Sequence, residues 1–518
     1  MRYNETHMDQ KLPKSQQSSI GDDGSAATSS YHDSGHNLSN EGGKGASQQE
    51  PQRSMPIEQE QPMVSPYLQQ CVSFHSSDYK EHRQKIYIRF GLIILAMATL
   101  LLTALSIYWG SFYEISEKTK DLKMLVVIGD ESTIEGVSPV FGTAMEALLK
   151  QPPANSSGDW HIYKEGEFKH LAQDHDNTIR EEILRQIHHQ LYWAAIYVKP
   201  NASYNYHQAL ANGDTRYNVS DDTVAAYYET ARDFIIIPQY VTPLLKKIET
   251  LWLHQQSNMI SQLAQNVTIN STPQTSLLAQ SLQFTMVDKL PISDHVLGAP
   301  MQLGFIYLII VSFFQVSFFA EPHQKVAKTP IKRPHYLLYR YISSILAFFF
   351  LSLIFGLASL AYQIDFTVTY GKSGFLVYWS ITFLTMCAVG LANEVMAMLI
   401  IPIYPPLLGF WLIFWVIVNI APTYNAVALT NNFYRYGYAI PIHNGYEATK
   451  TVFFDVYKGQ LGRNIGILVA WVVMLSCVFP FAVMHFSKAM GKKAAAAAKA
   501  QLEAAKRAEE EKNARGDV

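Results

Sequence analysis

Cysteine and net charge are both scarce in this sequence. Only three of its 518 residues are cysteines, and two of them, Cys387 and Cys477, lie inside apolar runs. Three cysteines cannot form the disulfide framework of a small secreted protein. The formal net charge of −2 gives no indication of the basic surface that nucleic-acid-binding proteins carry, so we expect no nucleic-acid partner.

Signatures of catalysis and of nucleotide binding are also lacking. The stretch Gly371–Ser373 reads Gly-Lys-Ser, like the end of a phosphate-binding loop, but residue 366 is Phe where that loop needs glycine. Neither H-E-x-x-H nor G-x-S-x-G occurs, and no carboxylate or cysteine pattern beside His188 and His189 indicates a metal site. We therefore expect no enzyme, no cofactor and no metal. ATP-driven work would need a separate ATPase.

The first 80 residues lack apolar clusters and are rich in Ser, Gln, Gly and Asp. Such a composition cannot bury enough apolar surface to offset the entropy that the chain loses on ordering. We therefore predict a disordered tail over residues 1–80.

Six apolar windows dominate the rest of the sequence, and most have about 20 residues, the length of a helix that crosses a bilayer. They are Tyr87–Trp109, Gln302–Ala320, Leu337–Tyr362, Phe375–Ile400, Leu407–Ile420 and Ile465–His485. The first window begins far from residue 1 and is longer than the core of a signal peptide, so we expect a retained anchor. The pattern predicts an α-helical integral membrane protein with six transmembrane helices.

Basic residues indicate which ends of these windows face the cytosol, where lysine and arginine collect. They precede the first window, fill the loop between the second and third, and follow the sixth: Arg83, Lys85, Arg89, Lys325, Lys328, Lys332, Arg333, Lys488, Lys492 and Lys493. Both termini, including the disordered tail, are therefore expected in the cytosol. The proline-rich turn over residues 401–406 is expected to be a tight cytosolic hairpin.

Residues 110–301 separate the first two windows and predict a small α/β domain outside the cytosol. Three strand-like apolar runs occur in it: Lys123–Asp130, Tyr192–Val198 and Leu282–Val287. A helix is expected from Pro139 to Lys150 with Ser138 as its N-cap, and a long helical pattern lies within Pro238–Asn266.

Five N-x-S/T sequons crowd into the same domain, at Asn155, Asn201, Asn218, Asn266 and Asn270. Two more, at Asn4 and Asn37, fall in the cytosolic tail, where no glycan is expected. Because N-glycosylation occurs on the lumenal side, the crowding supports the predicted side of the domain and makes its five asparagines candidate glycosylation sites.

Asn393 and Glu394 lie near the cytosolic end of the fourth window, and Arg340 enters the third window from the same side. At ~1.5 Å of rise per residue, Glu394 and Arg340 both lie within roughly 10 Å of the cytosolic boundary and can pair. A carboxylate within a span is costly and usually faces protein or water. Three interpretations stay open: a polar point on a translocation path, a structural ion pair, or a Glu whose side chain reaches the membrane interface.

The segment over residues 431–457 is too polar to span a membrane and too aromatic for an ordinary loop. Asn444 followed by Glu447 resembles a capping box, which predicts a helix over Gly445–Tyr457. Its aromatic face indicates an amphipathic helix on the outer membrane surface or in a re-entrant hairpin. Residues 488–518 are rich in Ala, Lys and Glu and predict a cytosolic helical tail.

This segment also carries a family resemblance. Phe414–Trp471, and above all the stretch YRYGYAIPIHN at Tyr434–Asn444, resembles the closing region of the fungal nitrosoguanidine-resistance membrane proteins. A looser resemblance covers Ile88–His485. It implies a fungal plasma-membrane protein linked to resistance to toxic chemicals, and supplies no catalytic residues. The layout is also similar to ABC-2 type permeases, while the large domain after the first span is more similar to bacterial membrane proteins related to phage-infection receptors.

Two functions follow as hypotheses. One is an exporter-like protein that removes toxic compounds, works among membrane lipids, and draws energy from a separate ATPase or an ion gradient. The other is a non-transporting membrane organiser or signalling scaffold whose Ser-rich tail binds partners after phosphorylation. The sequence indicates neither the substrate nor the oligomeric state.

Overall fold

The computed structural model describes residues 74–77, 79–292, 294–425 and 427–516. The chain divides into two units, Met1–Tyr79 and Lys80–Val518, and the second contains the sheet and the long helices. Nearly all of the predicted disordered tail, with Cys71 and the sequons at Asn4 and Asn37, lies outside the described residues.

A five-stranded sheet forms the centre of the segment between the first two long helices. Its strands are β1 Lys123–Ile128, β2 Asp159–Lys164, β3 Ala194–Val198, β4 Val224–Tyr228 and β5 Thr285–Asp288. Their order in the sheet is β2-β1-β3-β4-β5, and all neighbouring pairs are parallel except β3 with β4. The predicted α/β sheet therefore exists, and we call this region the sheet domain.

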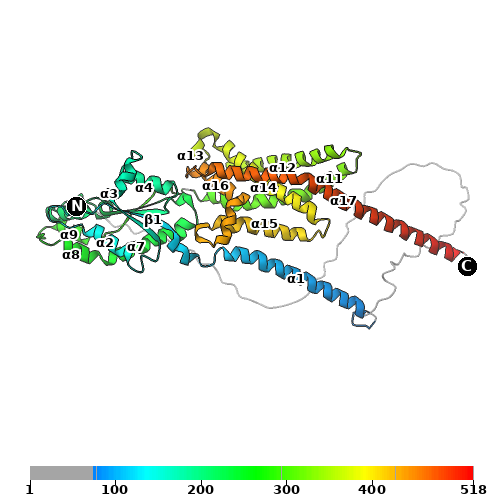
Figure 1. Ribbon diagram of the computed structural model, residues 1–518, viewed down its shortest axis with the longest axis horizontal. Coiled ribbons are helices and arrows are strands. Elements are labelled where there is room, and N and C mark those ends of the chain that lie inside the picture. Colours follow the sequence, from blue (N-terminus) through cyan, green and yellow to red (C-terminus); the bar gives the residue numbers. More distant parts are fainter. Residues whose placement is uncertain (1–73, 78, 293, 426, 517–518) are drawn as a thin grey trace, which may run out of the picture. The chain divides into compact units, whose positions relative to one another are not determined.

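Helices cover both faces of the sheet (Figure 1). In β1, Met124 and Val126 join a core with α2, α5, α7 and α8, whereas Leu125 and Val127 join a second core with α3 and α4. This division follows from the alternation of side chains along a strand, and a strand covered on both faces is apolar throughout. The helices of the domain are η2 Ile115–Asp121, α2 Val140–Lys150, α3 Glu165–Gln173, α4 Ile179–His188, α5 Ala202–Asn212, α6 Val219–Thr223, η3 Thr230–Arg232, η4 Ile237–Val241, α7 Thr242–His254, α8 Gln256–Leu263 and α9 Thr272–Ala279.

Some local predictions for this domain were incomplete. Strands β2 Asp159–Lys164 and β4 Val224–Tyr228 were missed, and β2 is a half-buried polar edge strand. The cap predicted at Ser138 was wrong, because α2 begins at Val140 after Pro139 and no side chain caps it. The long pattern over Pro238–Asn266 divides into η4, α7 and α8.

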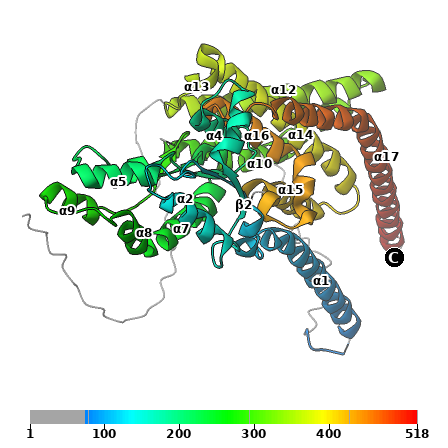
Figure 2. The same cartoon turned by 60° about the vertical axis from the view of Figure 1, so that its left-hand side comes forward.

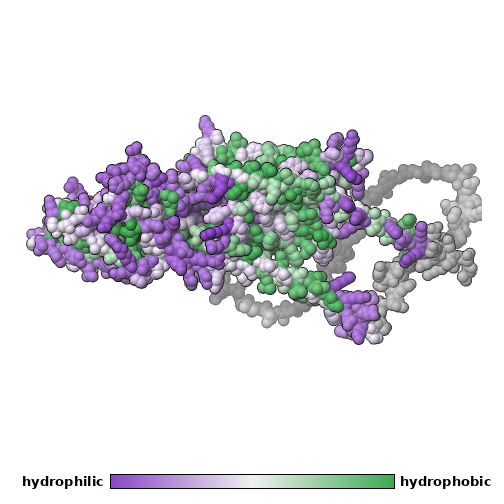
Figure 3. Space-filling view, in the orientation of Figure 1, coloured by the Kyte–Doolittle hydropathy of each residue, from purple (hydrophilic) through white to green (hydrophobic). Residues whose placement is uncertain are grey.

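Six helical stretches of the described residues are long and apolar enough to cross a membrane. They are Lys80–Gly110, His295–Ala327, Arg333–Ala361, Thr367–Ile400, Leu407–Tyr424 and Leu461–Arg507. The predicted multi-pass membrane character is thus confirmed. Figure 3 shows hydrophobic residues gathered over these helices and hydrophilic residues over the sheet domain.

These stretches are built from helices that are partly broken. The elements are α1 Lys80–Gly110, η5 His295–Leu297, η6 Ala299–Leu303, α10 Gly304–Phe318, α11 Ala320–Ala327, α12 Arg333–Ala361, α13 Thr367–Tyr370, η7 Gly371–Ser373, α14 Gly374–Ile400, α15 Leu407–Tyr424, η8 Val427–Leu429, η9 Asn432–Ala439, α16 Pro441–Phe454 and α17 Leu461–Gly516. The turn between α14 and α15 occupies residues 401–406, where the sequence predicted a hairpin.

The predicted last span and the C-terminal tail are one continuous helix, α17. The sequence placed a span over Ile465–His485 and a separate helical tail from residue 488. No proline follows His485, and the alanine-rich tail favours helix strongly enough to continue through Gly491, so the helix propagates through the junction. Similarly, α1 begins at Lys80 rather than Tyr87.

Helix α14 is the central helix of the bundle. It packs against α10, α12, α15, α16 and α17, and 61% of its apolar window is buried, against 6% for α1. Gly390 permits this packing, because a Cβ atom there would lie 2.5 Å from the ring of Phe348 on α12. Figures 1 and 2 show α14 among the other long helices and α1 at their edge.

Candidate functional site

The candidate site lies where α14 meets α10, α12 and α15. Consecutive residues of a helix point about 100° apart, so Asn393 and Glu394 face different neighbours of α14. Asn393 faces α10 and α15, while Glu394 faces α12, and both side chains are completely buried. The site is therefore a set of polar groups enclosed between otherwise apolar helices.

Arg340 and Glu394 form an ion pair between α12 and α14. The Arg340 Nη2 atom donates to Glu394 Oε2 at 3.0 Å, and Arg340 is 8% exposed. The structure thus brings together two residues that the sequence placed at the same depth. A pair this deeply buried is costly to desolvate and is weak evidence for stability.

Asn393 has a donor or acceptor for each polar group of its amide. Its Nδ2 atom donates to the Ile309 carbonyl and to Ser312 Oγ, both at 3.0 Å, and its Oδ1 atom accepts from Trp411 Nε1 at 3.0 Å. These bonds join α14 to α10 and α15. Asn393 is therefore a satisfied structural link beside the ion pair.

The second oxygen of Glu394, Oε1, receives no hydrogen bond from any described residue. Gln315 of α10 and Ser344 of α12 lie beside the carboxylate, but neither forms a well-aligned bond to Oε1. Both polar atoms of the buried Gln315 amide also lack partners in the described structure. Buried groups left in this state cost roughly 1–3 kcal/mol each, so Oε1 keeps an unused capacity to take part in a hydrogen bond.

His323 extends this polar region toward the basic loop at residues 328–332. It lies on α11, its Nδ1 atom is 3.2 Å from the Tyr339 hydroxyl, and its buried Nε2 atom has no partner among the described groups. Sequence reasoning missed both His323 and Gln315. The sequence shows each as a polar interruption near the second apolar window, but only the fold places them near Arg340 and Glu394.

The segment over residues 431–457 forms η9 and then α16, and two predictions about it were wrong. Helix α16 begins at Pro441, so Asn444 lies inside it and donates to the carbonyls of Tyr438 and Ile440 instead of capping it. Every residue of α16 except Glu447 is buried, by packing against α14, α15 and α17. A helix lying on the membrane surface would expose a polar face, so the surface-lying form of the prediction is excluded.

Helix α16 joins the bundle to the sheet domain through Lys450. The Lys450 Nζ atom donates to the carbonyl of Arg232 at 2.7 Å and lies 2.7 Å from Glu447 Oε1. Arg232 in turn donates to the carbonyl of Tyr192, and its guanidinium lies 3.8 Å from the ring centre of Trp193. Burial lowers the pKa of Arg232 to about 10, so it stays charged near neutral pH.

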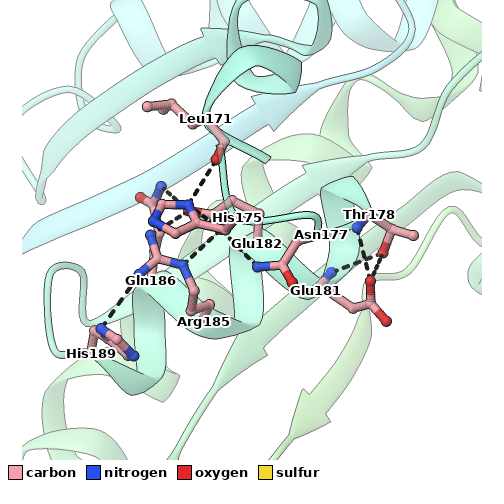
Figure 4. A network of polar contacts seen from close by, with 9 residues as sticks. All are labelled: Leu171, His175, Asn177, Thr178, Glu181, Glu182, Arg185, Gln186 and His189. Atoms are coloured by element: carbon pink, nitrogen blue, oxygen red, sulfur yellow. Dashed lines mark hydrogen bonds and ion pairs between the residues drawn. The ribbon is translucent and has the colours of Figure 1, made fainter. Parts of the chain in front are cut away.

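A second buried carboxylate, Glu182, lies in the sheet domain on α4 (Figure 4). Arg185 donates to both of its oxygens at 2.7 Å, Gln186 donates to Oε1 at 2.9 Å, and Asn177 donates to Oε2 at 3.0 Å. Burial alone would raise the pKa of Glu182, but these hydrogen bonds lower it to about 2. Because both oxygens are satisfied, this network stabilises α4 and the turn before it.

All five sequon asparagines of the sheet domain are exposed to solvent: Asn155, Asn201, Asn218, Asn266 and Asn270. Their exposure leaves each accessible to modification. Glycosylation of these residues stays a prediction.

Comparison with known proteins places the chain among membrane proteins. It is similar to an uncharacterized endoplasmic reticulum membrane protein of Saccharomyces cerevisiae, with 32% identity over 443 residues, which cover 82% of this chain and 86% of the relative. No solved structure matches the chain.

A family model described as "Protein of unknown function (DUF3533)" matches residues 93–477. The match runs from α1 to α17, and so includes the sheet domain, α16 and the Arg340–Glu394 pair. Neither comparison mentions nitrosoguanidine resistance or a permease. On the length of this match and the identity to the yeast membrane protein, the chain belongs to the DUF3533 family.

Proposed function

We propose that this protein is a permease-like membrane protein that moves toxic small molecules across its membrane and so contributes to chemical resistance. The open oxygen of the buried Glu394, on the central helix of the bundle, carries the proposal. Ionisable groups within spans are rare and usually belong to substrate or ion pathways. A purely structural pair would be expected to satisfy both carboxylate oxygens.

Polar groups at a second level of α14 support a path along this helix. A Cβ atom at Gly445 of α16 would lie 2.4 Å from Thr385 Oγ1, so α16 approaches α14 closely at that level. Thr385 and Glu394 are nine positions apart, which corresponds to about 13 Å along a helix. Both side chains are buried, so the bundle is closed to solvent in this conformation, and transport requires α16 or its neighbours to move.

The link between Lys450 and Arg232 suggests what drives that motion. A substrate or partner that shifts the sheet domain would act on α16 directly, because Lys450 bonds to the backbone of η3. In the proposed topology the sheet domain lies outside the cytosol, as the basic residues at the other ends of the spans favour. Energy then comes from a separate ATPase or from an ion gradient, and the protein itself is not an enzyme.

The membrane in which the protein works is also a proposal. The family resemblance at Tyr434–Asn444 favours the plasma membrane, whereas the relative in Saccharomyces cerevisiae is named as an endoplasmic reticulum membrane protein. We favour the endoplasmic reticulum, because the identity to that relative covers most of both chains. A fluorescent tag at the C-terminus, compared with markers of both membranes, distinguishes the two.

A flux assay tests transport directly. Vesicles of defined lipid that contain the purified chain are loaded with nitrosoguanidine as the probe. They should release the probe faster than loaded vesicles without the protein. Glu394→Gln should lower this rate by about tenfold or more. Absence of flux, with or without candidate ATPases and ion gradients, would contradict the proposal.

A non-transporting membrane organiser is the second candidate. The closed bundle and the fully satisfied Asn393 favour it, because a scaffold needs no internal path. Deletion of residues 1–80 separates the two functions. A transporter keeps most of its flux without this tail, whereas a scaffold loses bound partners and its resistance phenotype.

A further inference from the structure

Glu394 and Gln315 lie beside each other, and both have buried polar atoms that form no well-aligned hydrogen bond with any described residue. The carboxylate offers Oε1 as an acceptor, and the amide of Gln315 offers an acceptor and a donor; the two groups are close enough to interact but are not aligned for a hydrogen bond. A proton on Oε1 would make that oxygen a donor, for which the amide carbonyl of Gln315 is an acceptor. One added proton would therefore satisfy two buried atoms at once.

The charged and titratable groups around Glu394 allow such a change. On α12, Arg340 faces Glu394. On α11, His323 lies nearer the basic loop and contacts the hydroxyl of Tyr339. From α17, the side chains in the shared core are apolar and include Phe479 and Val483. The charged residues of α16 lie near the other end of α14, at the level of the sheet domain.

His323 supplies a step between water and the carboxylate. An imidazole has two ring nitrogens, so it can accept a proton at one and give up a proton from the other. Its buried Nε2 atom has no partner in the described structure, and its Nδ1 atom contacts the hydroxyl of the residue before Arg340. His323 is therefore the described titratable group that we assign to the step between the basic loop and the buried pair.

We infer that Glu394 is a proton-binding site which alternates between an ion pair with Arg340 and a hydrogen bond to Gln315. In the exchange, a hydronium ion gives its proton to His323 and leaves as water, His323 passes a proton on to Oε1 and returns to its neutral form, and no bond between heavy atoms forms or breaks. The site gains one positive charge, so its occupancy responds to the membrane potential. Its role as the energy source of transport rests on the proposed function, whereas proton binding itself does not.

Infrared difference spectroscopy on the full chain in lipid nanodiscs tests this without a substrate. Lowering the pH between about 9 and 4 should produce the carbonyl-stretch band of a newly protonated carboxyl group. Burial also raises the pKa of Glu165 and of Asp233 in the sheet domain, so these residues contribute to the same region of the spectrum. The decisive quantity is the part of the carbonyl-stretch band that the unsubstituted protein shows and Glu394→Gln does not.

Two further variants complete the test. Gln315→Leu should keep the band but shift it to higher frequency, because the acceptor of the new hydrogen bond is gone. Glu182→Gln should leave it unchanged, because the pKa of Glu182 lies at about 2, below the range scanned. A spectrum in which Glu394→Gln retains the full band, or in which Gln315→Leu does not move it, overturns the inference.

The flux assay distinguishes failure of this inference from failure of the proposed function. If the Glu394 band appears but no nitrosoguanidine flux is measured, the proton-binding site is supported and the proposed transport function is contradicted. If flux is measured but does not change with an imposed pH gradient, and no Glu394 band appears, the transport function is supported and proton binding at Glu394 is contradicted. If Glu394→Gln does not fold, the shift in Gln315→Leu still decides, since that change removes no charge.

Discussion

Glu182 of the sheet domain and Glu394 of the helix bundle are both completely buried and both paired with arginine, but their surroundings differ. Glu182 bonds to residues near it in sequence, and four donors cover both of its oxygens. Glu394 on α14 accepts a hydrogen bond from Arg340 on α12 through Oε2, and its Oε1 atom accepts none from the described residues. The comparison separates a carboxylate whose structure is complete from one with capacity for a further ligand or proton.

The energetic meaning of burial differs accordingly. For Glu182, hydrogen bonds from neighbouring residues offset the cost of desolvating the carboxylate, and its lowered pKa shows that the charged form is stabilised. For Glu394, one hydrogen-bonded contact offsets the burial of two charges, and this is rarely enough for a net gain in stability. We therefore propose that this costly group on the central helix serves function rather than folding.

The largest expected effect comes from removing Arg340. Arg340→Met leaves Glu394 as a buried charge without its partner and should destabilise the bundle by about 3–5 kcal/mol. The double variant Arg340→Met with Glu394→Leu should recover most of that loss, because no charge remains buried. Thermal unfolding in detergent measures both. If the double variant is no more stable than Arg340→Met, the Arg340–Glu394 ion pair itself contributes net stability, and its role is structural like that of the Arg185–Glu182 pair.

Acid should affect the two carboxylates differently. The pKa of Glu182 is lowered in the folded state from 4.5 to about 2, so its stabilising contribution is complete above the unfolded value and is lost as the pH falls from about 4.5 toward 2. Glu182→Gln should therefore be less stable at neutral pH, by about 1–3 kcal/mol, and should lose less on acidification. Unfolding curves of both proteins at several pH values check this, and parallel losses on acidification would contradict the assignment.

The glutamines beside the two carboxylates should respond with opposite signs. Gln186→Leu removes a donor to Glu182 and should destabilise the sheet domain by about 1–2 kcal/mol. Gln315→Leu removes an amide without partners and should be neutral or stabilising by up to about 1 kcal/mol. Equal destabilisation by the two changes, measured by melting temperature under the same conditions, would remove the contrast between the sites.

The smallest effect on stability is expected at the glycosylation candidates. If the sheet domain lies outside the cytosol, Asn218→Gln should lose one glycan and migrate faster by one step, with a loss of stability limited to its helix cap, about 1 kcal/mol. Asn270→Gln is the matched control, because Asn270 is exposed, caps no helix and has no positive φ, and it should change mobility alone. Mobility that no sequon variant and no glycosidase alters would contradict the proposed side of the domain.

The spans could be predicted from the sequence because length and hydropathy are local properties. The pairing of Arg340 with Glu394 could also be anticipated, since both residues lie at the same depth once the topology is assigned. The position of α16 could not be predicted, because Asn444 and Glu447 form a plausible cap in isolation. Only tertiary packing shows that the chain enters the helix earlier, at Pro441.

The unsatisfied groups were beyond sequence reasoning for a related reason. Whether Gln315 finds a partner depends on atoms contributed by α12 and α14, which the sequence does not place. The edge strand β2 was missed because Asp159–Lys164 alternates weakly and is only half-buried. In both cases the missing information was which surfaces meet.

The central claim is that the open oxygen of Glu394, rather than burial or charge alone, indicates function. Nitrosoguanidine flux measured side by side for Glu394→Gln and Glu182→Gln, in the same lipid and at matched protein content, tests it most directly. We predict a loss of about tenfold or more for Glu394→Gln and an unchanged rate for folded Glu182→Gln. Equal rates for the two variants would contradict the claim.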